Sequence, residues 1–336
     1  MKRPLMRGDG KPGEQKKMET LPFERIGVLM GGISREREVS LRSGKAVLEA
    51  LLAAGLNAEG IDLADGDFEG ALRGREIDFA FIALHGAGGE DGTIQAVLEK
   101  LGVPYLGTRP ASSRKAFDKI ESKKVFEKTR VPTPAFEILT SADWRERLEK
   151  LRFPVFIKPP CEGSSIDVCQ VRDLSDAERG FTLLFEKYPV LMAEAKITGP
   201  ELTVSILGER PLPVIEIRPK RDFYDYTAKY TKGMTEYLVP APITSEETRN
   251  VQRAALFAHR ALGLRDFSRV DVILSGGIPF VLEVNTIPGF TETSLFPKAA
   301  GAVGMGFGDL CVELLRIAAR RLKNETAQEK DALHFS

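Results

Sequence analysis

Histidine and cysteine are scarce in this chain of 336 residues, which contains three of each. The cysteine spacings match neither a disulfide framework nor a CxxC zinc knuckle, and an odd number is typical of reduced thiols. The histidines form no HExxH pair, so a catalytic zinc ion would have to be held almost entirely by carboxylates. The shortage of both residues argues against zinc chemistry.

A surplus of charge and a long apolar run are missing as well. The 48 Lys and Arg residues balance 48 Asp and Glu residues, so no net field attracts a nucleic-acid backbone or an anionic membrane surface. No stretch reaches the roughly 18 apolar residues of a transmembrane helix, and the first residues lack the apolar core of a secretory signal. We therefore expect a cytoplasmic protein with no nucleic acid and no membrane among its partners.

The composition that is present, 43% hydrophobic and 29% charged residues, is typical of a soluble globular protein. Residues 1–21 contain Lys, Gly and Pro without periodicity, which predicts a disordered tail. From Ile26 onward, short apolar runs such as 79–84 alternate with helical periods, which predicts α/β structure around a parallel sheet. After a helix expected at 112–129, apolar runs with only one clear helix favour antiparallel sheet and an α+β class.

The clearest chemical pattern lies in a predicted hairpin, RVDVILSGGIPFVLEVN, whose strands are otherwise apolar. Period-two alternation places Arg269 and Asp271 on one face of the first strand, and Glu283 and Asn285 on one face of the second. With a three-residue loop, Asp271 lies opposite Glu283. A two-residue loop would separate the two pairs onto opposite faces.

If these side chains meet, they supply two carboxylates and an amide oxygen. Such a hard, oxygen-only set suits Mg²⁺, with bound phosphates completing the coordination. The alternative interpretation is a salt-bridged, solvent-facing side of an edge hairpin.

A cradle for those phosphates is predicted where a strand ends in Lys158 and continues into Gly163, Ser164 and Ser165. Backbone amides, two hydroxyls and an ammonium suit a triphosphate. Glycine and serine also form ordinary turns, so this pattern is weak by itself. The GxxxxGK[ST] and GxGxxG nucleotide-binding patterns are absent.

Two glycine-rich, charged loops follow strands of the predicted parallel sheet. MGGISREREVSLRSG contains Glu36 at a helix start, and LHGAGGEDG contains His85 at the carboxyl end of a strand. Open α/β sheets bind ligands at that edge. A glutamate can merely complement a helix dipole, and a lone histidine is more often structural. The presence of both loops nevertheless favours a small polar ligand.

Seven motifs in this order, GGISREREVSLRSG, HGAGGEDGTIQ, DKIESK, KPPCEGSS, YDYTAKY, RVDV and EVNTIPGFTETS, resemble those of the D-alanine:D-alanine ligases of the ATP-grasp superfamily. The resemblance covers residues from about 26 to 322. It implies a three-domain ATP-grasp fold and the ATP-dependent joining of two D-alanines through an acyl phosphate, for peptidoglycan precursors. The implied cofactors are ATP and Mg²⁺, with Mn²⁺ as a substitute, and similar ligases are commonly homodimers.

Composition, the pattern along the chain and the resemblance together indicate where the domains begin and end. A final helix is expected from Asp309 to about Leu322. We expect the chain to divide into a disordered tail (1–21), an N-terminal α/β domain (22–107), a central ATP-grasp subdomain (108–193), a C-terminal ATP-grasp subdomain (194–325) and a second tail (326–336).

Individual roles follow from the same resemblance. The residues implied to bind ATP are Lys119 and Lys158 for phosphates, Ser165 in the phosphate loop, Glu194 for the adenine amino group and Glu201 for the ribose. The implied metal ligands are Asp271, Glu283 and Asn285. The implied catalytic residues are Glu36, Ser164 and Tyr230 around the first ammonium, Lys229 at the γ-phosphate, and Arg269 with the backbone of Gly289 at the oxyanion. The implied substrate-binding residues are His85 for the first amino acid, and Ser294 and Leu295 for the second.

Two positions depart from the family pattern. Asp167 stands where the family usually has glycine, and Phe117 where it prefers methionine. An inward Asp167 would put an anion near the triphosphate and weaken ATP binding, whereas an outward one would be harmless. Phe117 is interpreted as a packing change.

Two other functions stay open. A ligase that joins D-alanine to D-lactate or D-serine shares the activation step, although the pair Lys229 and Tyr230 resembles the dipeptide-forming pattern. A module that binds ATP without catalysis would be expected to have lost charged site residues, and none is missing.

Overall fold

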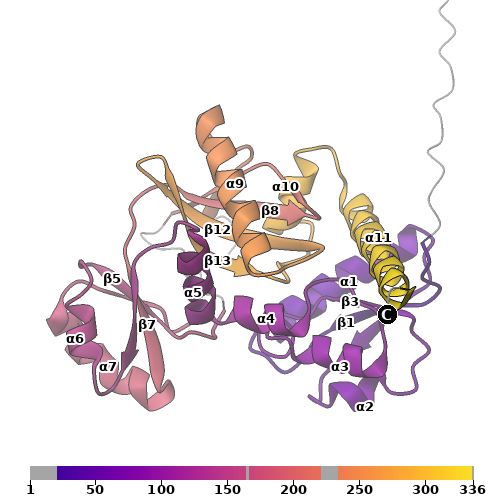
Figure 1. Cartoon of the computed structure of the whole chain (residues 1–336), viewed down its shortest axis with the longest axis horizontal. Coiled ribbons are helices and arrows are strands. Elements are labelled where there is room, and N and C mark those ends of the chain that lie inside the picture. Colours follow the sequence, from indigo (N-terminus) through magenta and orange to yellow (C-terminus); the bar gives the residue numbers. More distant parts are fainter. Residues whose placement is uncertain (1–20, 164–165, 221–233, 335–336) are drawn as a thin grey trace, which may run out of the picture.

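The computed structural model describes residues 21–163, 166–220 and 234–334, and it contains three sheets that follow one another along the molecule (Figure 1). The first sheet is parallel, with β1 (Ile26–Met30) between β2 (Ala58–Asp62) and β3 (Phe79–Ile82). Every residue of β1 and β3 is buried, as expected for strands covered on both faces. The predicted parallel N-terminal sheet is confirmed.

The other two sheets are antiparallel, as predicted. The strands of the central sheet are β4 (Phe136–Thr140), β5 (Val155–Lys158), β6 (Cys169–Val171) and β7 (Val190–Ala195), in the order β4-β7-β5-β6. The strands of the C-terminal sheet are β8 (Glu201–Leu207), β9 (Arg210–Pro211), β10 (Ile215–Pro219), β11 (Thr235–Leu238), β12 (Phe267–Ser275) and β13 (Ile278–Asn285). The latter sheet has the order β11-β10-β8-β12-β13, and β9 pairs with β8.

Helices flank each sheet (Figure 1). Those of the first part are α1 (Arg37–Ala53), α2 (Phe68–Leu72), α3 (Thr93–Leu101), α4 (Pro110–Phe117) and α5 (Lys119–Thr129). Those of the remainder are α6 (Trp144–Leu148), α7 (Leu174–Lys187), α9 (Ser245–Ala261), α10 (Leu295–Gly301) and α11 (Phe307–His334). The single helix expected at 112–129 is wrong, because Asp118 leaves the helical conformation and begins a new helix.

The hairpin of β12 and β13 forms the predicted pairs by a route that was not predicted. Asp271 lies opposite Glu283, and Arg269 lies opposite Asn285. The connecting loop is a two-residue Gly-Gly turn, the alternative that would separate the two pairs in a regular hairpin. A β-bulge next to Asp271 shifts the register by one residue and returns all four side chains to one face.

The last helix packs beside α1 and shares the core of the first sheet. Val28 and Met30 of β1 share one buried core with Leu310 and Leu314 of α11, and Figure 1 shows α11 beside α1. The expected end at about Leu322 is wrong, since α11 continues through the supposed tail to His334. Residues 323–334 include neither proline nor glycine, so nothing in the sequence stops the helix.

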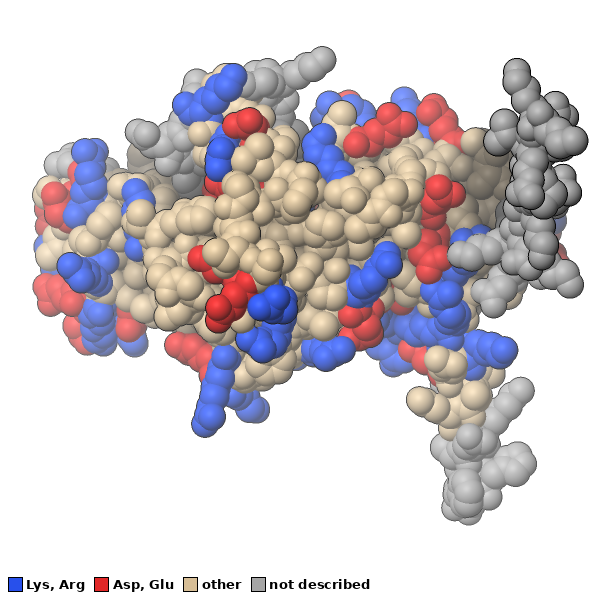
Figure 2. All heavy atoms as spheres, turned by 90° about the horizontal axis from the view of Figure 1, so that it is seen from above, with Lys and Arg blue, Asp and Glu red and all other residues tan. Residues whose placement is uncertain are grey.

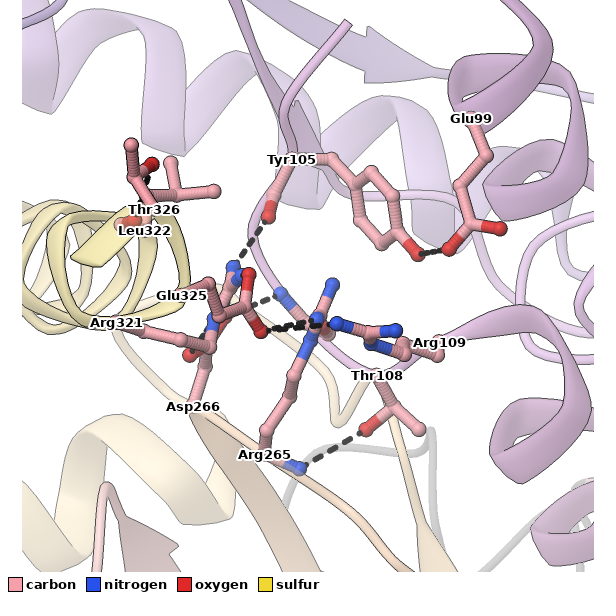
Figure 3. A network of polar contacts seen from close by, with 11 residues as sticks. Glu99, Tyr105, Thr108, Arg109, Arg265, Asp266, Arg321, Leu322, Glu325 and Thr326 are labelled. Atoms are coloured by element: carbon pink, nitrogen blue, oxygen red, sulfur yellow. Dashed lines mark hydrogen bonds and ion pairs between the residues drawn. The ribbon is translucent and has the colours of Figure 1, made fainter. Parts of the chain in front are cut away.

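A polar network fastens α11 to the N-terminal part of the chain and to the segment just before β12 (Figure 3). Arg321 donates from Nε to Asp266 Oδ1 over 2.8 Å and from Nη2 to the carbonyl of Tyr105 over 2.8 Å. The other oxygen of Asp266 accepts from the backbone N–H of Gly107 at 2.9 Å, and Arg265 donates to the carbonyl of Gly107 at 2.8 Å. The side chain of Asp266 is 1% exposed, so these donors replace the water that it loses.

Charged side chains of both signs are distributed over the surface (Figure 2). Figure 2 shows positive and negative side chains intermixed around a band of uncharged residues on one face. Within the described ranges, no helix is both long and apolar enough to cross a bilayer.

Candidate active site

A cleft of about 480 Å³ lies between the loops of the first sheet, the start of α5 and the open face of the β12–β13 hairpin. Most of the described residues that the sequence predicted for the site line this cleft. They are Glu36, His85, Lys119, Arg269, Asp271, Glu283, Asn285, Gly289, Ser294 and Leu295.

The hairpin face carries a dense arrangement of charge. Arg269 forms a fork with Asp271, with Nε to Oδ1 and Nη2 to Oδ2 both at 2.9 Å. Asp271 also accepts from Thr203 Oγ1 at 2.6 Å and from Asn285 Nδ2 at 3.2 Å. Asp271 is 9% exposed, and such a buried carboxylate needs this compensation.

The donor chemistry of this face fits a magnesium ion. Asp271 and Glu283 are direct neighbours across the hairpin and supply hard oxygen ligands. Cations already lie against both carboxylates, namely Arg269 on Asp271 and the Lys119 ammonium 3.2 Å from Glu283. Within the described ranges, no group of three or more His, Cys, Asp or Glu side chains could hold a metal ion. Phosphate oxygens would therefore have to complete the ligand set on this face.

Lys119 reaches the cleft because Asp118 starts a helix there. Asp118 Oδ1 accepts from the backbone N–H of Ile120 at 2.8 Å and of Glu121 at 3.1 Å, which caps α5. The Lys119 ammonium donates to the carbonyl of Glu162 at 2.7 Å. Burial disfavours its charge, but the neighbouring Glu283 more than offsets this and raises the pKa of Lys119.

Glu36 lies between two glycine loops. A Cβ atom built on Gly86 would lie 2.9 Å from Glu36 Oε2, and one built on Gly163 would lie 3.0 Å from it. Gly86 also has a φ of +68°, which disfavours a side chain independently. The carboxylate therefore fits only because both loops lack side chains at these positions.

His85 is held in a fixed orientation at the base of the cleft. Its Nε2 lies 3.1 Å from Ser43 Oγ, and its Nδ1 lies 3.2 Å from the carbonyl of Ile287. The residue is only 5% exposed. His85 thus joins the first sheet to the segment that follows the hairpin.

The segment after the hairpin forms a tight turn at Ser294. The Ser294 hydroxyl accepts from the backbone N–H of Thr291 at 3.1 Å, and a Cβ atom built on Gly289 would lie 3.1 Å from that hydroxyl. Ser294 immediately precedes α10, which begins at Leu295. The turn keeps Gly289 and Ser294 close together along the cleft wall.

Three predicted ATP-binding residues lie outside the lining of this cleft. Lys158 forms an ion pair with Glu194, whose side chain is 2% exposed. Glu201 begins β8, opposite Ile217 and Ile273. Although burial opposes it, Lys123 and Lys158 hold the pKa of Glu194 below its usual range. Four further predicted residues, Ser164, Ser165, Lys229 and Tyr230, lie outside the described residues.

Some side chains line the cleft without having been predicted from the sequence. Val39 and Arg42 follow Glu36 at intervals of three residues, which places them on one face of α1. Glu90 belongs to the loop of His85 and accepts from the backbone N–H of Gly86 at 2.9 Å. Helical spacing could have identified the first two. Glu162 also lines the cleft, in a loop without a distinctive pattern.

The two residues that depart from the family pattern, Asp167 and Phe117, both lie within the described ranges. Asp167 adopts a φ of 54°, a conformation that glycine readily takes. Its carboxylate pairs with Lys187 and accepts from the Tyr188 hydroxyl at 2.6 Å, and these two groups lower the pKa of Asp167. The Asp167 carboxylate therefore contacts residues at the end of α7.

Phe117 lines the cleft, so its interpretation as a packing change alone is incomplete.

Known protein families resemble this chain over most of its length. The family models described as D-ala D-ala ligase N-terminus and D-ala D-ala ligase C-terminus match residues 59–108 and 125–316. The D-alanine–D-alanine ligase of Methylacidiphilum infernorum is 47% identical, with 89% of this chain and 96% of that protein covered. That of Desulforudis audaxviator is 46% identical, with 88% and 99% covered.

Solved structures agree. A D-alanine–D-alanine ligase from Bacillus anthracis superposes with a TM-score of 0.81 at 37% identity, covering 90% of this chain and 99% of that one. The VanG D-Ala:D-Ser ligase from Enterococcus faecalis has a TM-score of 0.77 at 29% identity, covering 88% and 99%. These matches confirm the expected ATP-grasp fold. Because identity and fold agree over nearly the whole chain, it belongs to the D-alanine–D-alanine ligase family.

Proposed function

We propose that this chain joins two D-alanine molecules into D-alanyl-D-alanine at the expense of ATP, in the cytoplasm, for peptidoglycan precursors. One observation carries the proposal: a single cleft collects Glu36 and His85 from the first sheet, Lys119 from α5 and the charged face of the C-terminal hairpin. The Bacillus anthracis ligase has also been solved in complex with ATP, with a TM-score of 0.79 to this chain.

The first step activates a carboxylate, which is otherwise a poor electrophile. A carboxylate oxygen of the first D-alanine attacks the γ-phosphorus of ATP, and the bond to ADP breaks, which leaves an acyl phosphate. Lys119 and Lys158 neutralise phosphate charge in this proposal, aided by Ser165 and Lys229. Glu194 and Glu201 hold the adenine amino group and the ribose.

The second step forms the amide bond. The amine of the second D-alanine, after losing a proton, attacks the acyl carbon, and phosphate leaves from the tetrahedral intermediate. Arg269 and the backbone N–H of Gly289 stabilise the developing oxyanion. Their fixed position costs no reorganisation, because Arg269 is already held by its fork with Asp271.

Substrate orientation is assigned to the cleft walls. Glu36 holds the first ammonium, together with Ser164 and Tyr230, and His85 lines the first amino-acid subsite. Ser294 and Leu295 hold the second carboxylate. These contacts supply the alignment that a reaction between two bound substrates requires.

A magnesium ion would be held by Asp271, Glu283 and Asn285. When bound, it supplies charge neutralisation and orientation to the phosphates. Asp271 uses both oxygens on Arg269 and neighbouring donors, and Glu283 faces Lys119. Arg269 and Lys119 thus hold the two carboxylates that would bind the metal ion.

A second candidate function differs in the acceptor substrate. One structural neighbour is a D-Ala:D-Ser ligase at 29% identity, so D-serine, like D-lactate, is an alternative acceptor. The higher identity of 47% to a D-alanine–D-alanine ligase favours D-alanine.

The test is to incubate the full chain with ATP, Mg²⁺ and D-alanine, with D-serine and D-lactate as competing acceptors, and to weigh the products. We expect D-alanyl-D-alanine and one phosphate per peptide bond. Omission of Mg²⁺, with chelator present, should stop turnover, and Mn²⁺ should restore it. Predominant D-alanyl-D-serine or depsipeptide would change the acceptor, and absence of nucleotide-dependent phosphate release would refute the activity.

The domain division belongs to this proposal too. We place the first boundary at 107/108, before α4, and the second after Ala195, because β7 continues to that residue and a boundary at 193/194 would cut the strand. Assembly as a homodimer is proposed only by analogy with similar ligases, and size-exclusion chromatography with light scattering tests it.

A further inference from the structure

One wholly buried lysine has no part in the proposed mechanism. Lys123, on α5, has a side chain that is 0% exposed, and it is among the largest fully buried side chains of the described ranges. Burying an ammonium is costly unless it is paired and hydrogen-bonded. The groups around Lys123 therefore indicate which negative charge its ammonium balances.

Lys123 shares one carboxylate with a second lysine. Its ammonium pairs with Oε1 of Glu194, while Lys158 pairs with Oε2 of the same residue. The two lysines differ in accessibility, because the side chain of Lys158 is 14% exposed and that of Lys123 is fully buried. Only Lys158 is therefore placed to turn toward a ligand.

The ammonium of Lys123 is fixed by a second anchor. It donates to Thr133 Oγ1 at 2.6 Å, and the Thr133 hydroxyl donates to the carbonyl of Val281 at 2.7 Å. Val281 belongs to β13, the strand that carries Glu283 and Asn285. This chain of hydrogen bonds ties Glu194 of the central sheet to the C-terminal hairpin.

The arrangement has a consequence for nucleotide binding, and this step rests on the proposed function. When a triphosphate attracts Lys158, Glu194 keeps Lys123 as its counter-ion. A buried carboxylate without a cation takes up a proton, and its hydroxyl then donates instead of accepting. The amino group of adenine is a donor, whereas guanine presents the acceptor O6 at that position. A charged Glu194 thus favours adenine.

The geometry points to Lys123 as a positioning residue for nucleobase specificity: it keeps Glu194 charged and oriented so that the site selects ATP over GTP. Burial lowers the pKa of Lys123 to about 8, and Glu194 counteracts this lowering. The ammonium is consequently still protonated near neutral pH.

Four variants of the full chain test this role. Lys123→Met removes the charge at similar volume, and Lys123→Arg retains the charge. Thr133→Val removes the second anchor. Lys124→Met is the matched control, because this neighbouring lysine is 51% exposed and pairs with Glu121 on the helix surface.

The primary measurement is calorimetric binding of ATP and of GTP, each with Mg²⁺ and without D-alanine. We expect Lys123→Met to lower the ratio of ATP to GTP affinity by at least about tenfold, because adenine loses a charge-assisted hydrogen bond. Lys123→Arg should restore most of that ratio, and Lys124→Met should leave it unchanged. An unchanged ratio in Lys123→Met, or equal losses for both nucleotides, overturns the proposal.

Failure of the variant to fold and absence of ligase activity are separate outcomes of this experiment. If Lys123→Met does not fold, Thr133→Val decides: we expect a fall in the ratio of about twofold to fivefold, and an unchanged ratio overturns the proposal. D-alanine ligation is measured in parallel. A chain that binds ATP but makes no dipeptide refutes the proposed function, while the affinity ratio still tests Lys123.

Discussion

Two arginines of the C-terminal sheet form the same fork with a carboxylate two residues away. Arg269 holds Asp271 inside the cleft, with both bonds at 2.9 Å. Arg218 holds Glu216 with bonds of 2.7 and 3.0 Å and does not line the cleft. Substituting each arginine in turn therefore separates the effect of losing a bidentate ion pair from the effect of losing a contact to the oxyanion.

We expect Arg269→Lys to lower kcat by about a hundredfold to a thousandfold, because an ammonium cannot reproduce the planar fork and its alignment to the oxyanion. Arg218→Lys should change kcat by less than about twofold, because its pair is partly solvated. Steady-state kinetics with D-alanine measure both. Equal effects of the two substitutions, or an unfolded Arg269→Lys, would contradict the assigned role.

His259 predicts how stability changes with pH. It is fully buried, and its Nδ1 lies 2.8 Å from Ser268 Oγ. Burial lowers the pKa of His259 to about 4, compared with about 6.5 in an unfolded chain. Between these values the unfolded state binds a proton that the folded state does not, so stability falls as the pH falls.

The expected loss from this group is roughly 3 kcal/mol between pH 6.5 and 4. Urea unfolding of the full chain and of His259→Gln over that range measures it. The variant should be less stable at pH 7, and the difference should shrink toward pH 4, since glutamine takes up no proton. A difference that stays constant with pH would show that His259 is not the group responsible.

At the scale of one element, the start of α5 places a helix cap directly before a lysine that lines the cleft. Asp118 caps the helix, and the next residue is Lys119, which lies against Glu283. Asp173 caps α7 in the same way, accepting from the backbone N–H of Asp176 at 2.9 Å, but it lies away from the cleft lining.

We predict that Asp118→Ala and Asp173→Ala each destabilise the fold by about 1 kcal/mol, as lost caps do. Only Asp118→Ala should also raise KM for ATP, by about tenfold, because it releases the first turn that directs Lys119. Asp118→Asn should retain the cap and the KM. Thermal unfolding and kinetics check both effects, and an increase in KM for Asp173→Ala would count against the coupling.

The hairpin of β12 and β13 shows how far sequence reasoning extends at this scale. Alternation predicted which side chains share a face, because the period of a strand is fixed by its backbone. The pairing of Asp271 with Glu283 was tied to a three-residue loop, yet it forms with a two-residue loop because the bulge shifts the register. Bulges leave no clear pattern in one sequence. The break at Asp118, in contrast, was readable, because an aspartate before Lys-Ile-Glu is typical of an N-cap.

At the scale of the whole molecule, the network around Asp266 joins α11, the residue that precedes β12 and the backbone of Tyr105 (Figure 3). Arg321 supplies two bonds to a carboxylate whose side chain is 1% exposed. Arg320, its neighbour, pairs with Glu313 at the surface and is 56% exposed.

Arg321→Met should lower the free energy of unfolding by about 3 to 5 kcal/mol, because it leaves a buried carboxylate with too few donors. Arg320→Met should cost less than about 1 kcal/mol. Urea unfolding of the two variants measures the difference. If Arg321→Met unfolds at the same denaturant concentration as Arg320→Met, the network does not hold the parts of the chain together.

The shared core of β1 and α11 also sets an order of events during synthesis. Val28 and Met30 leave the ribosome early, but Leu310 and Leu314 of the same core are translated far later. Domains often fold while the chain is still growing, and here the core over one face of the first sheet contains α1 early but stays incomplete without α11. A nascent chain stalled before Phe307 should therefore be open to chaperones and proteases at its N-terminal sheet, until translation of α11 closes it.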